Sequence, residues 1–254
     1  MTESSGSLEF AGLRLAWRER GSGPLLVLLP GSTASSAHHA GELEYFGRRF
    51  RAAALDLPGT GRSERRDRWP DDWWDLGAHA AAALVDRLAA GPAVLVGSSG
   101  GGVVALLAAA LHPASVRAVI ADSTVPRYDP DFLRRAAVLR KLETPPSVAF
   151  WEHGHGEDWR EVVDADSAFL ERIGAAGGDP FAGRLTRVGC PVLLTGSLGD
   201  ELIGGIGEGA LEIARAIPGS QVFLTREGKH PMIWTRPAEF RAVADAFLAA
   251  LPGR

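Results

Sequence analysis

Residues 93–113 read "AVLVGSSGGGVVALLAAALHP", where two serines and four glycines separate two apolar runs. The first run, 93–96, has the length and composition of a buried strand, and the second, 103–113, has those of a buried helix that ends at proline. Flexible linkers are rich in glycine and serine, but they do not lie between two buried elements. The glycines therefore predict a tight turn from strand to helix.

The pattern Gly-x-Ser-x-Gly decides which serine this turn presents. It fits Gly97, Ser99 and Gly101, whereas Ser98 would need glycine at the position of Val96. A serine at the apex of such a strand-turn-helix is held in strained geometry, so that its hydroxyl stands clear of both elements. Its neighbours two positions away must be small because strand and helix pass close to each other there. The sequence predicts Ser99 as a nucleophile.

Two backbone amides are expected to form an oxyanion hole beside this serine. Gly100 is expected to begin the helix after the turn, so its N–H lies where the helix dipole favours negative charge. The second donor is expected from the loop "LLPGSTASS" (28–36), where Gly31 permits a sharp turn and Ser32 supplies the N–H.

A histidine and an acid are expected later in the chain, because folds that use this elbow order the residues as serine, acid, histidine. "LTREGKHPMIW" places His230 after the last predicted strand, and "PVLLTGSLGDEL" offers Asp200 after the strand before it. One more residue than usual separates Gly196 from Asp200. We rank Asp200 first as the acid, Asp122 at the end of an earlier strand second, and Glu201 third.

Apolar runs of strand length alternate with helical patterns along most of the chain. Strands that are apolar throughout and separated by helices indicate an α/β fold with a mostly parallel sheet covered on both faces. Residues 8–21 instead indicate an antiparallel hairpin at its edge. The predicted strands are 24–31, 51–59, 93–98, 116–123, 191–197 and 221–228, and the clearest helices are 71–90 and 237–251.

The alternation breaks once, over residues 125–185. This segment has no strand pattern and contains Trp151, Trp159 and several glycines and prolines, so it is too structured for a loop. We expect a core made of 1–124 and 186–254, with 125–185 as a helical cap. Ligands of open α/β folds bind at the carboxyl ends of the strands, where such a cap would roof the site.

The composition limits the classes of binding partner and the cellular compartment that we expect. The 254 residues carry a formal net charge of -4, and no segment has a basic stripe, so we expect no nucleic-acid partner. The single cysteine, Cys190, suits a reducing compartment. Neither a signal peptide nor an apolar run of membrane-spanning length is visible. These observations predict a cytoplasmic protein, monomer or homodimer, that binds a small molecule and no membrane.

The motifs together resemble the α/β-hydrolase superfamily, to which "DLPGTGRS" (56–63) adds a further characteristic loop. Within it the chain is most similar, over nearly its whole length, to the valacyclovir hydrolase (biphenyl hydrolase-like) group. The stretch "REGKHPMIWTRPAEFRAVADAFL" (226–248) is the most specific match. Members of that group carry an acid directly after the nucleophile, where it engages a substrate's amino group, but this chain has Gly100.

The resemblance implies an α/β-hydrolase fold and serine hydrolysis of a small carboxylic ester, thioester or lactone, without preference for amino-acid esters. Carbon–carbon bond hydrolysis or perhydrolysis on the same residues, or a small-molecule receptor with a retained hydrolase pocket, are the alternatives. No metal or other cofactor is expected, and His153 and His155 are expected on a solvated turn. The residues expected near the substrate are Trp151, Trp159, Ile203 and Trp234.

Overall fold

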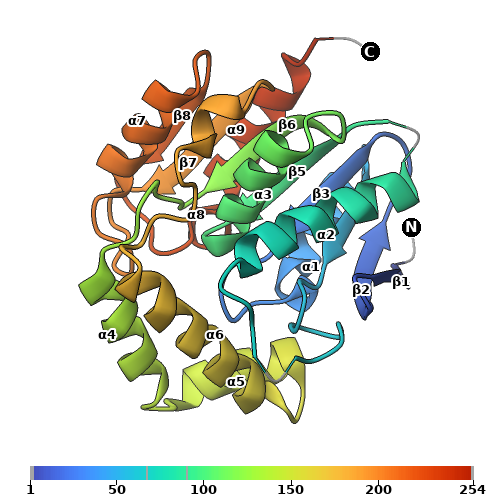
Figure 1. Cartoon of the computed structure of the whole chain (residues 1–254). Coiled ribbons are helices and arrows are strands. Elements are labelled where there is room, and N and C mark those ends of the chain that lie inside the picture. Colours follow the sequence, from blue (N-terminus) through green and yellow to red (C-terminus); the bar gives the residue numbers. More distant parts are fainter. Residues whose placement is uncertain (1–2, 67, 90, 253–254) are drawn as a thin grey trace.

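The computed structural model describes residues 3–66, 68–89 and 91–252. Within these residues an eight-stranded sheet of order β1-β2-β4-β3-β5-β6-β7-β8 forms the centre of the molecule, with helices on both faces (Figure 1). The pairs β1–β2 and β2–β4 are antiparallel and all others are parallel, which confirms the predicted sheet and its edge hairpin. The strands are β1 (Ser4–Phe10), β2 (Leu13–Arg20), β3 (Leu25–Leu29), β4 (Arg51–Leu55), β5 (Ala93–Ser98), β6 (Val116–Asp122), β7 (Val192–Ser197) and β8 (Gln221–Thr225).

The strands β3, β5 and β7 are buried from end to end because both of their faces are covered. Successive side chains of a strand point to opposite faces. In β3, therefore, Leu25, Val27 and Leu29 belong to one hydrophobic cluster, and Leu26 and Leu28 belong to the other. The apolar "LLVLL" thus predicts a strand at the centre of two cores.

Two sets of helices cover the two faces. The first cluster is completed by α2 (Trp73–Leu88), α3 (Gly100–Leu111) and α7 (Ile206–Ala216), and the second by α1 (Ala40–Phe46), α8 (Met232–Thr235) and α9 (Pro237–Ala249). A short 3₁₀ helix, η1 (Ser36–His39), precedes α1. Within the described part of the chain, no helix is both long and apolar enough to cross a bilayer.

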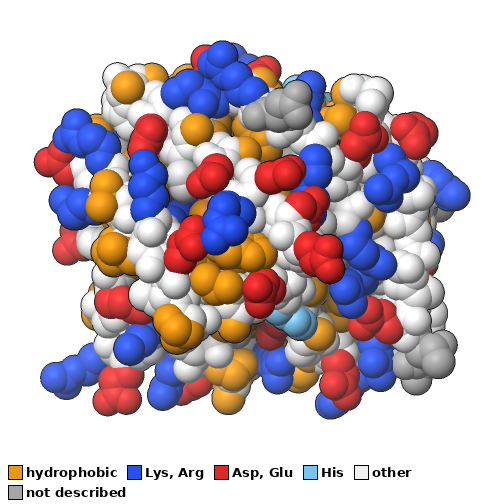
Figure 2. All heavy atoms as spheres, turned by 90° about the horizontal axis from the view of Figure 1, so that it is seen from below, with side chains coloured by type: hydrophobic (Ala, Val, Ile, Leu, Met, Phe, Trp, Pro, Cys, Tyr) orange, Lys and Arg blue, Asp and Glu red, His pale blue; other side chains and the backbone are white. Residues whose placement is uncertain are grey.

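The segment between β6 and β7 forms the cap. It contains α4 (Pro130–Arg140), α5 (Pro145–His155), α6 (Trp159–Ala175) and the 3₁₀ helix η2 (Arg184–Arg187), and Figure 1 shows α4, α5 and α6 grouped at one end of the molecule. Leu133, Phe169 and Leu170 join the hydrophobic cluster of the core. Seen from the cap side, acidic and basic side chains are interspersed over the surface, and hydrophobic ones gather near its middle (Figure 2).

His155, at the end of α5, ties the cap to the core. Its Nδ1 accepts a hydrogen bond from the Gly61 amide at 2.9 Å, and its Nε2 donates to the Thr33 carbonyl at 3.0 Å. Burial lowers the pKa of His155 to about 4, so the ring is neutral near pH 7. The expectation of a solvated turn was therefore wrong for His155, because these tertiary hydrogen bonds outweigh the flanking glycines.

Candidate active site

Ser99 lies between β5 and α3 with φ 53° and ψ -121°, backbone angles that few residues other than glycine adopt. Neighbouring chain holds it there. The Ser99 amide donates to the Asp122 carbonyl at 2.7 Å, and the Thr124 hydroxyl donates to the Ser99 carbonyl at 2.7 Å. Such a strained conformation costs on the order of 1–3 kcal/mol and persists where surrounding contacts over-determine it.

The two outer glycines of the motif are explained by close packing of backbone. A Cβ on Gly97 would lie 2.1 Å from the Gly101 carbonyl oxygen, and one on Gly101 would lie 2.0 Å from the Leu29 carbonyl oxygen. Any side chain at either position would therefore push strand and helix apart. This is the steric need that the sequence pattern predicts.

Asp200 and His230 form a hydrogen-bonded pair at the carboxyl ends of β7 and β8. Asp200 Oδ2 lies 2.7 Å from His230 Nδ1, and Asp200 Oδ1 accepts from the amides of Leu202 and Ile203 at 3.0 and 2.7 Å. The two side chains are only 1% and 9% exposed. The carboxylate is thus fixed on both oxygens, and Nε2 is the imidazole nitrogen left to face a reactant.

Neither of the other two candidate acids, both of which lie in the described part of the chain, forms a hydrogen bond with the imidazole. Asp122 is fully buried; its Oδ1 accepts from the Thr195 hydroxyl at 2.7 Å and its Oδ2 from the Ile233 amide at 3.0 Å. Burial raises the pKa of Asp122 to about 6, and these hydrogen bonds oppose the rise. Glu201 accepts instead from the His230 backbone amide at 3.1 Å. The structure brings Asp200, the first-ranked candidate, to His230.

A turn absorbs the additional residue between Gly196 and Asp200. The strand β7 runs to Ser197, whose carbonyl accepts from the Asp200 amide at 3.1 Å. The Ser197 hydroxyl also accepts from the Gly199 amide at 3.2 Å. The carboxylate therefore reaches His230 even though the spacing departs from the usual one.

The loop after β3 packs directly against the serine turn. A Cβ on Gly31 would lie 2.9 Å from the Ser98 carbonyl oxygen and 3.0 Å from Ser99 Cβ, and one on Gly100 would lie 3.5 Å from Ser32 N. The backbone of Ser32 and that of Gly100 are therefore neighbours, as an oxyanion hole requires. Buried Asp56 holds this loop, because its Oδ1 accepts from the Ser36 amide at 2.7 Å.

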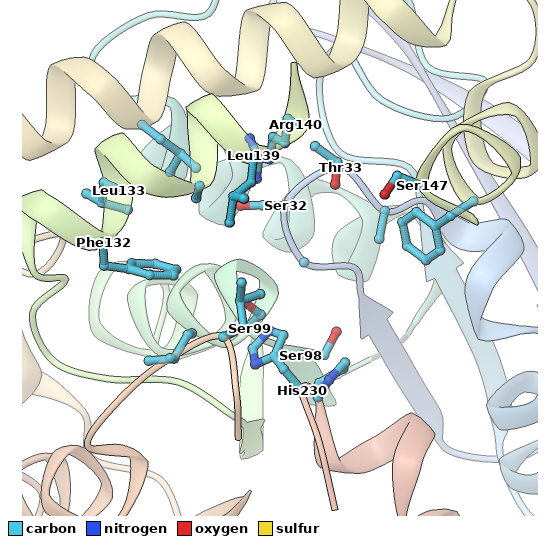
Figure 3. Close-up of a pocket in the computed structure, with 18 of the residues that line it drawn as sticks. Ser32, Thr33, Ser98, Ser99, Phe132, Leu133, Leu139, Arg140, Ser147 and His230 are labelled. Atoms are coloured by element: carbon cyan, nitrogen blue, oxygen red, sulfur yellow. The ribbon is translucent and has the colours of Figure 1, made fainter. Parts of the chain in front are cut away.

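Ser99 and His230 line one cavity of about 510 Å³ between the loops and the cap (Figure 3). Most of the other lining residues are apolar. Of the four residues expected near substrate, Trp151, Ile203 and Trp234 line it. Trp159 does not line it, contrary to that expectation: its ring stacks on that of Trp151 with centroids 5.2 Å apart, and it borders a separate, smaller hollow.

Sequence reasoning missed several lining residues. Trp74 on α2 and Tyr128 before α4 face the cavity, and one face of α4 forms its roof. The roof residues recur at helical spacing, which could have indicated a common face although not what it faces. They are Phe132, Leu133, Ala136, Leu139 and Arg140.

Residues 24–151 match the sequence profile of the family described as the alpha/beta hydrolase fold. The chain belongs to this family. Serine hydrolase BPHL is 28% identical in Mus musculus and 27% in Homo sapiens, and both matches cover 96% of this chain and 86% of the relative. The α/β-hydrolase fold and the likeness to the biphenyl hydrolase-like group are thereby confirmed, and the protein is a hydrolase of this family.

Another relative is the 2-(acetamidomethylene)succinate hydrolase of Mesorhizobium japonicum, 33% identical over 131 residues, a match that covers 51% of this chain and 46% of that enzyme. Among solved structures, E-2-(acetamidomethylene)succinate hydrolase superposes with a TM-score of 0.80 at 22% identity, over 98% of this chain and 100% of that one. The enol-lactonase from Burkholderia xenovorans superposes with a TM-score of 0.77 at 19% identity, over 96% and 100%. These structures share its fold.

Proposed function

We propose that this protein is a serine hydrolase that cleaves a small carboxylic ester, thioester or lactone through an acyl-enzyme on Ser99. One observation carries the proposal: a serine in strained geometry and a histidine already paired with a buried carboxylate line the same cavity. A structural serine would need neither the strain nor the neighbouring pair. Cys190 is a poor alternative nucleophile, because burial raises its pKa to about 11.

The reaction begins when Ser99 Oγ attacks the substrate carbonyl and His230 Nε2 takes the hydroxyl proton. Asp200 holds Nδ1–H and stabilises the imidazolium that forms. The carbonyl oxygen becomes an oxyanion, which the amides of Ser32 and Gly100 stabilise together with the N-terminus of α3. Collapse of this intermediate breaks the bond to the leaving group, and the imidazolium returns the proton to it.

Water then completes the cycle. His230 removes a proton from the water while its oxygen attacks the acyl carbon, and a second oxyanion forms in the same hole. Its collapse releases the carboxylic acid and returns the proton to Ser99 Oγ. In a lactone the leaving alcohol stays attached to the acyl part, so the product is a single hydroxy acid.

The size and lining of the cavity support a small substrate. About 510 Å³ accommodates an acyl group and a modest alcohol, and most of the lining is apolar. The named relatives include an enol-lactonase and serine hydrolases, in agreement with this class. One half-buried free cysteine is compatible with a reducing compartment, and we place the enzyme in the cytoplasm.

Active-site labelling and turnover test the proposal together. The purified protein is treated with a fluorophosphonate probe and assayed with phenyl esters, for the wild type and the variants Ser99→Ala and Ser98→Ala. We expect Ser99→Ala to lose both labelling and turnover, and Ser98→Ala, the matched neighbour, to keep labelling.

Labelling without repeated product release would contradict the proposal and favour a receptor. Loss of labelling in Ser98→Ala with retention in Ser99→Ala would overturn the nucleophile. Cleavage of a carbon–carbon substrate in preference to every ester and lactone tested would move the enzyme to another reaction on the same residues.

A further inference from the structure

We propose that the cavity contains a subsite for a substrate carboxylate beside the oxyanion loop, in which Arg140 pairs with the anion and Trp74 and Tyr128 donate hydrogen bonds. This inference rests on the proposed function and names its substrate class: esters or lactones whose acyl part carries a second, free carboxylate. The proposed catalytic steps do not involve Arg140, Trp74 or Tyr128, so they do not explain why these residues line the cavity.

Trp74 supplies the first unused donor. The residue is 4% exposed and lines the cavity, and within the described part of the chain its buried Nε1 has no hydrogen-bond partner. A Cβ on Gly100 would lie 3.5 Å from this nitrogen. The N–H therefore faces the space that the missing side chain of Gly100 leaves beside the nucleophile.

Tyr128 supplies the second. It is 5% exposed, lines the same cavity, and its hydroxyl has no hydrogen-bond partner among the described residues. Its ring stacks on that of Trp74 with centroids 5.6 Å apart. Buried polar atoms almost always find a partner in native structures, so two unpartnered ones on one cavity wall point to a ligand oxygen that completes them.

Arg140 supplies the charge. Its side chain is 15% exposed and lines the cavity on the α4 side, drawn above Ser32 in Figure 3. Only its Nη1 is bonded to described protein groups, namely Asp166 Oδ2 and the Ser167 hydroxyl, each at 3.2 Å. The other guanidinium N–H groups are left for a ligand, and their planar fork matches a carboxylate.

The charges around the cavity favour an anion over a cation. Among the described lining residues, none is Asp or Glu, and Arg140 is the one with a formal charge besides the titratable His230. Asp166 is buried, its carboxylate is hydrogen-bonded to Arg140, and it is not one of the lining residues. Ligands that only accept hydrogen bonds therefore fit this wall, and a substrate ammonium does not.

The apolar roof fits the carbon chain that joins the two ends of such a substrate. Phe132, Ala136 and Leu139 lie on one face of α4, which leads to Arg140 at its end. A dicarboxylic acid esterified at one end can thus place its scissile carbonyl at Ser99, its methylene groups under α4 and its free carboxylate at Arg140.

The test compares two esters of equal length, phenyl hexanoate and the monophenyl ester of adipic acid, in which a carboxylate replaces the terminal methyl group. We expect kcat/KM of the wild type to be at least about tenfold higher for the adipate ester, because the hydrogen bonds that stabilise a charged group commonly change kcat/KM by about tenfold or more. The readout for every variant is this ratio of adipate to hexanoate.

Four variants should change this ratio, three of them lowering it and one raising it. Replacing the whole ion pair by Arg140→Met with Asp166→Leu avoids an unpaired buried carboxylate and should lower the ratio about tenfold or more. Trp74→Phe and Tyr128→Phe remove one donor each while keeping the ring, and should lower it several-fold. Asp166→Asn leaves Arg140 its full charge for the ligand and should raise it.

Arg134→Gln is the matched control, because Arg134 lies on the same helix, is 66% exposed and is not a lining residue. An unchanged ratio in the double variant, or a wild type that prefers the hexanoate, overturns the subsite. Arg140 also borders a smaller surface hollow near Lys141, and a guanidinium turned only to that side would give this result. If neither ester is cleaved and the fluorophosphonate does not label Ser99, the proposed function has failed and the subsite with it.

Discussion

The carboxylate of Asp122 accepts a hydrogen bond from the Ile233 amide at 3.0 Å, in the short helix that follows His230. Asp122 ends β6, and its neighbour Ser123 accepts from the Met232 amide at 3.0 Å. The strand end thus holds the chain that carries the histidine, while Asp200 holds the imidazole itself. The two carboxylates therefore have separate roles: Asp122 holds the backbone of the loop, and Asp200 holds the imidazole ring.

This division predicts different effects of two equivalent substitutions. Asp200→Asn should lower kcat by roughly three to four orders of magnitude with little change in melting temperature, because the imidazole loses the partner that fixes its tautomer. Asp122→Asn should instead destabilise the fold by about 1–3 kcal/mol, since its amide group cannot accept all of the buried donors. Steady-state kinetics and thermal unfolding of both variants provide the test. A large loss of kcat in Asp122→Asn with a small loss in Asp200→Asn would show that Asp122, and not Asp200, is the acid.

Gly97, two residues before Ser99, gives a second prediction. Gly97→Ala places a Cβ against the Gly101 carbonyl oxygen, so it should cost about 1–3 kcal/mol of stability and reduce kcat at least about tenfold by displacing Ser99. Gly189→Ala is the control, because a Cβ there meets no atom within 4 Å. Urea unfolding and ester turnover should separate the two variants, and equal behaviour would mean that the elbow tolerates a side chain.

Gly100 predicts the treatment of amino esters. With glycine at this position we expect an acyl ester to be preferred over its α-amino analogue by about a hundredfold, because a buried ammonium finds no anion among the lining residues. Gly100→Asp should raise the relative kcat/KM of the amino ester about tenfold or more. The nearest atom to its Cβ is the Ser32 hydroxyl oxygen at 3.2 Å, which can rotate away.

Gly100→Asn has nearly the same shape without the charge and serves as the matched control. It should leave the ratio of amino ester to acyl ester near that of the wild type. A wild type that already prefers the amino ester would show that a carboxylate outside the lining, such as Asp166, reaches the substrate.

His155 predicts a dependence of stability on pH. Its pKa is about 4 in the folded protein and near 6.5 when unfolded, so the unfolded state binds more protons between these values. The stability that neutral His155 contributes is complete above about pH 6.5 and is lost as the pH falls towards 4, by up to about 3 kcal/mol. His155→Gln keeps an amide donor for Thr33 and does not titrate.

The measurement is the free energy of unfolding of wild type minus His155→Gln, in urea, from pH 7.5 to 4.5. Groups common to both proteins cancel in this difference. We expect it to be constant above pH 7 and to shift against the wild type as the pH falls, and a difference that does not vary with pH would contradict the neutral ring.

The sequence predicts those features whose physical cause is local. Gly97 and Gly101 sit beside the serine that they make possible, and apolar strands such as 25–29 identify themselves by composition. Folds of this type order the residues as serine, acid, histidine, so Asp200 can be ranked first despite one additional residue in its turn, and the structure places it against His230.

Features set by how distant elements pack could not be predicted in this way. Trp159 begins α6, and nothing in its neighbourhood along the chain shows that it stacks on Trp151 rather than facing the cavity. His155 stands among glycines that indicate a turn, but its partners Gly61 and Thr33 lie far away in sequence. From the sequence alone, Arg140 resembles a solvated arginine on the surface of a helix, because the sequence does not show that α4 lies over the cavity.

The cap is attached unevenly. Around the start of α6, Arg65 donates hydrogen bonds to both Asp158 carboxylate oxygens at 2.8 Å, and together with His155 it fastens that side of the cap to the core. In contrast, α4 packs chiefly on α6, and its side chains Val138 and Leu139 are exposed. Local unfolding follows the weakest contacts, so the amides of α4 should exchange with deuterium well before those of the buried face of α6. Substrates would then come and go by brief detachment of one helix, and the turnover rate would respond to the hydrophobicity of that helix although it contributes nothing to bond cleavage.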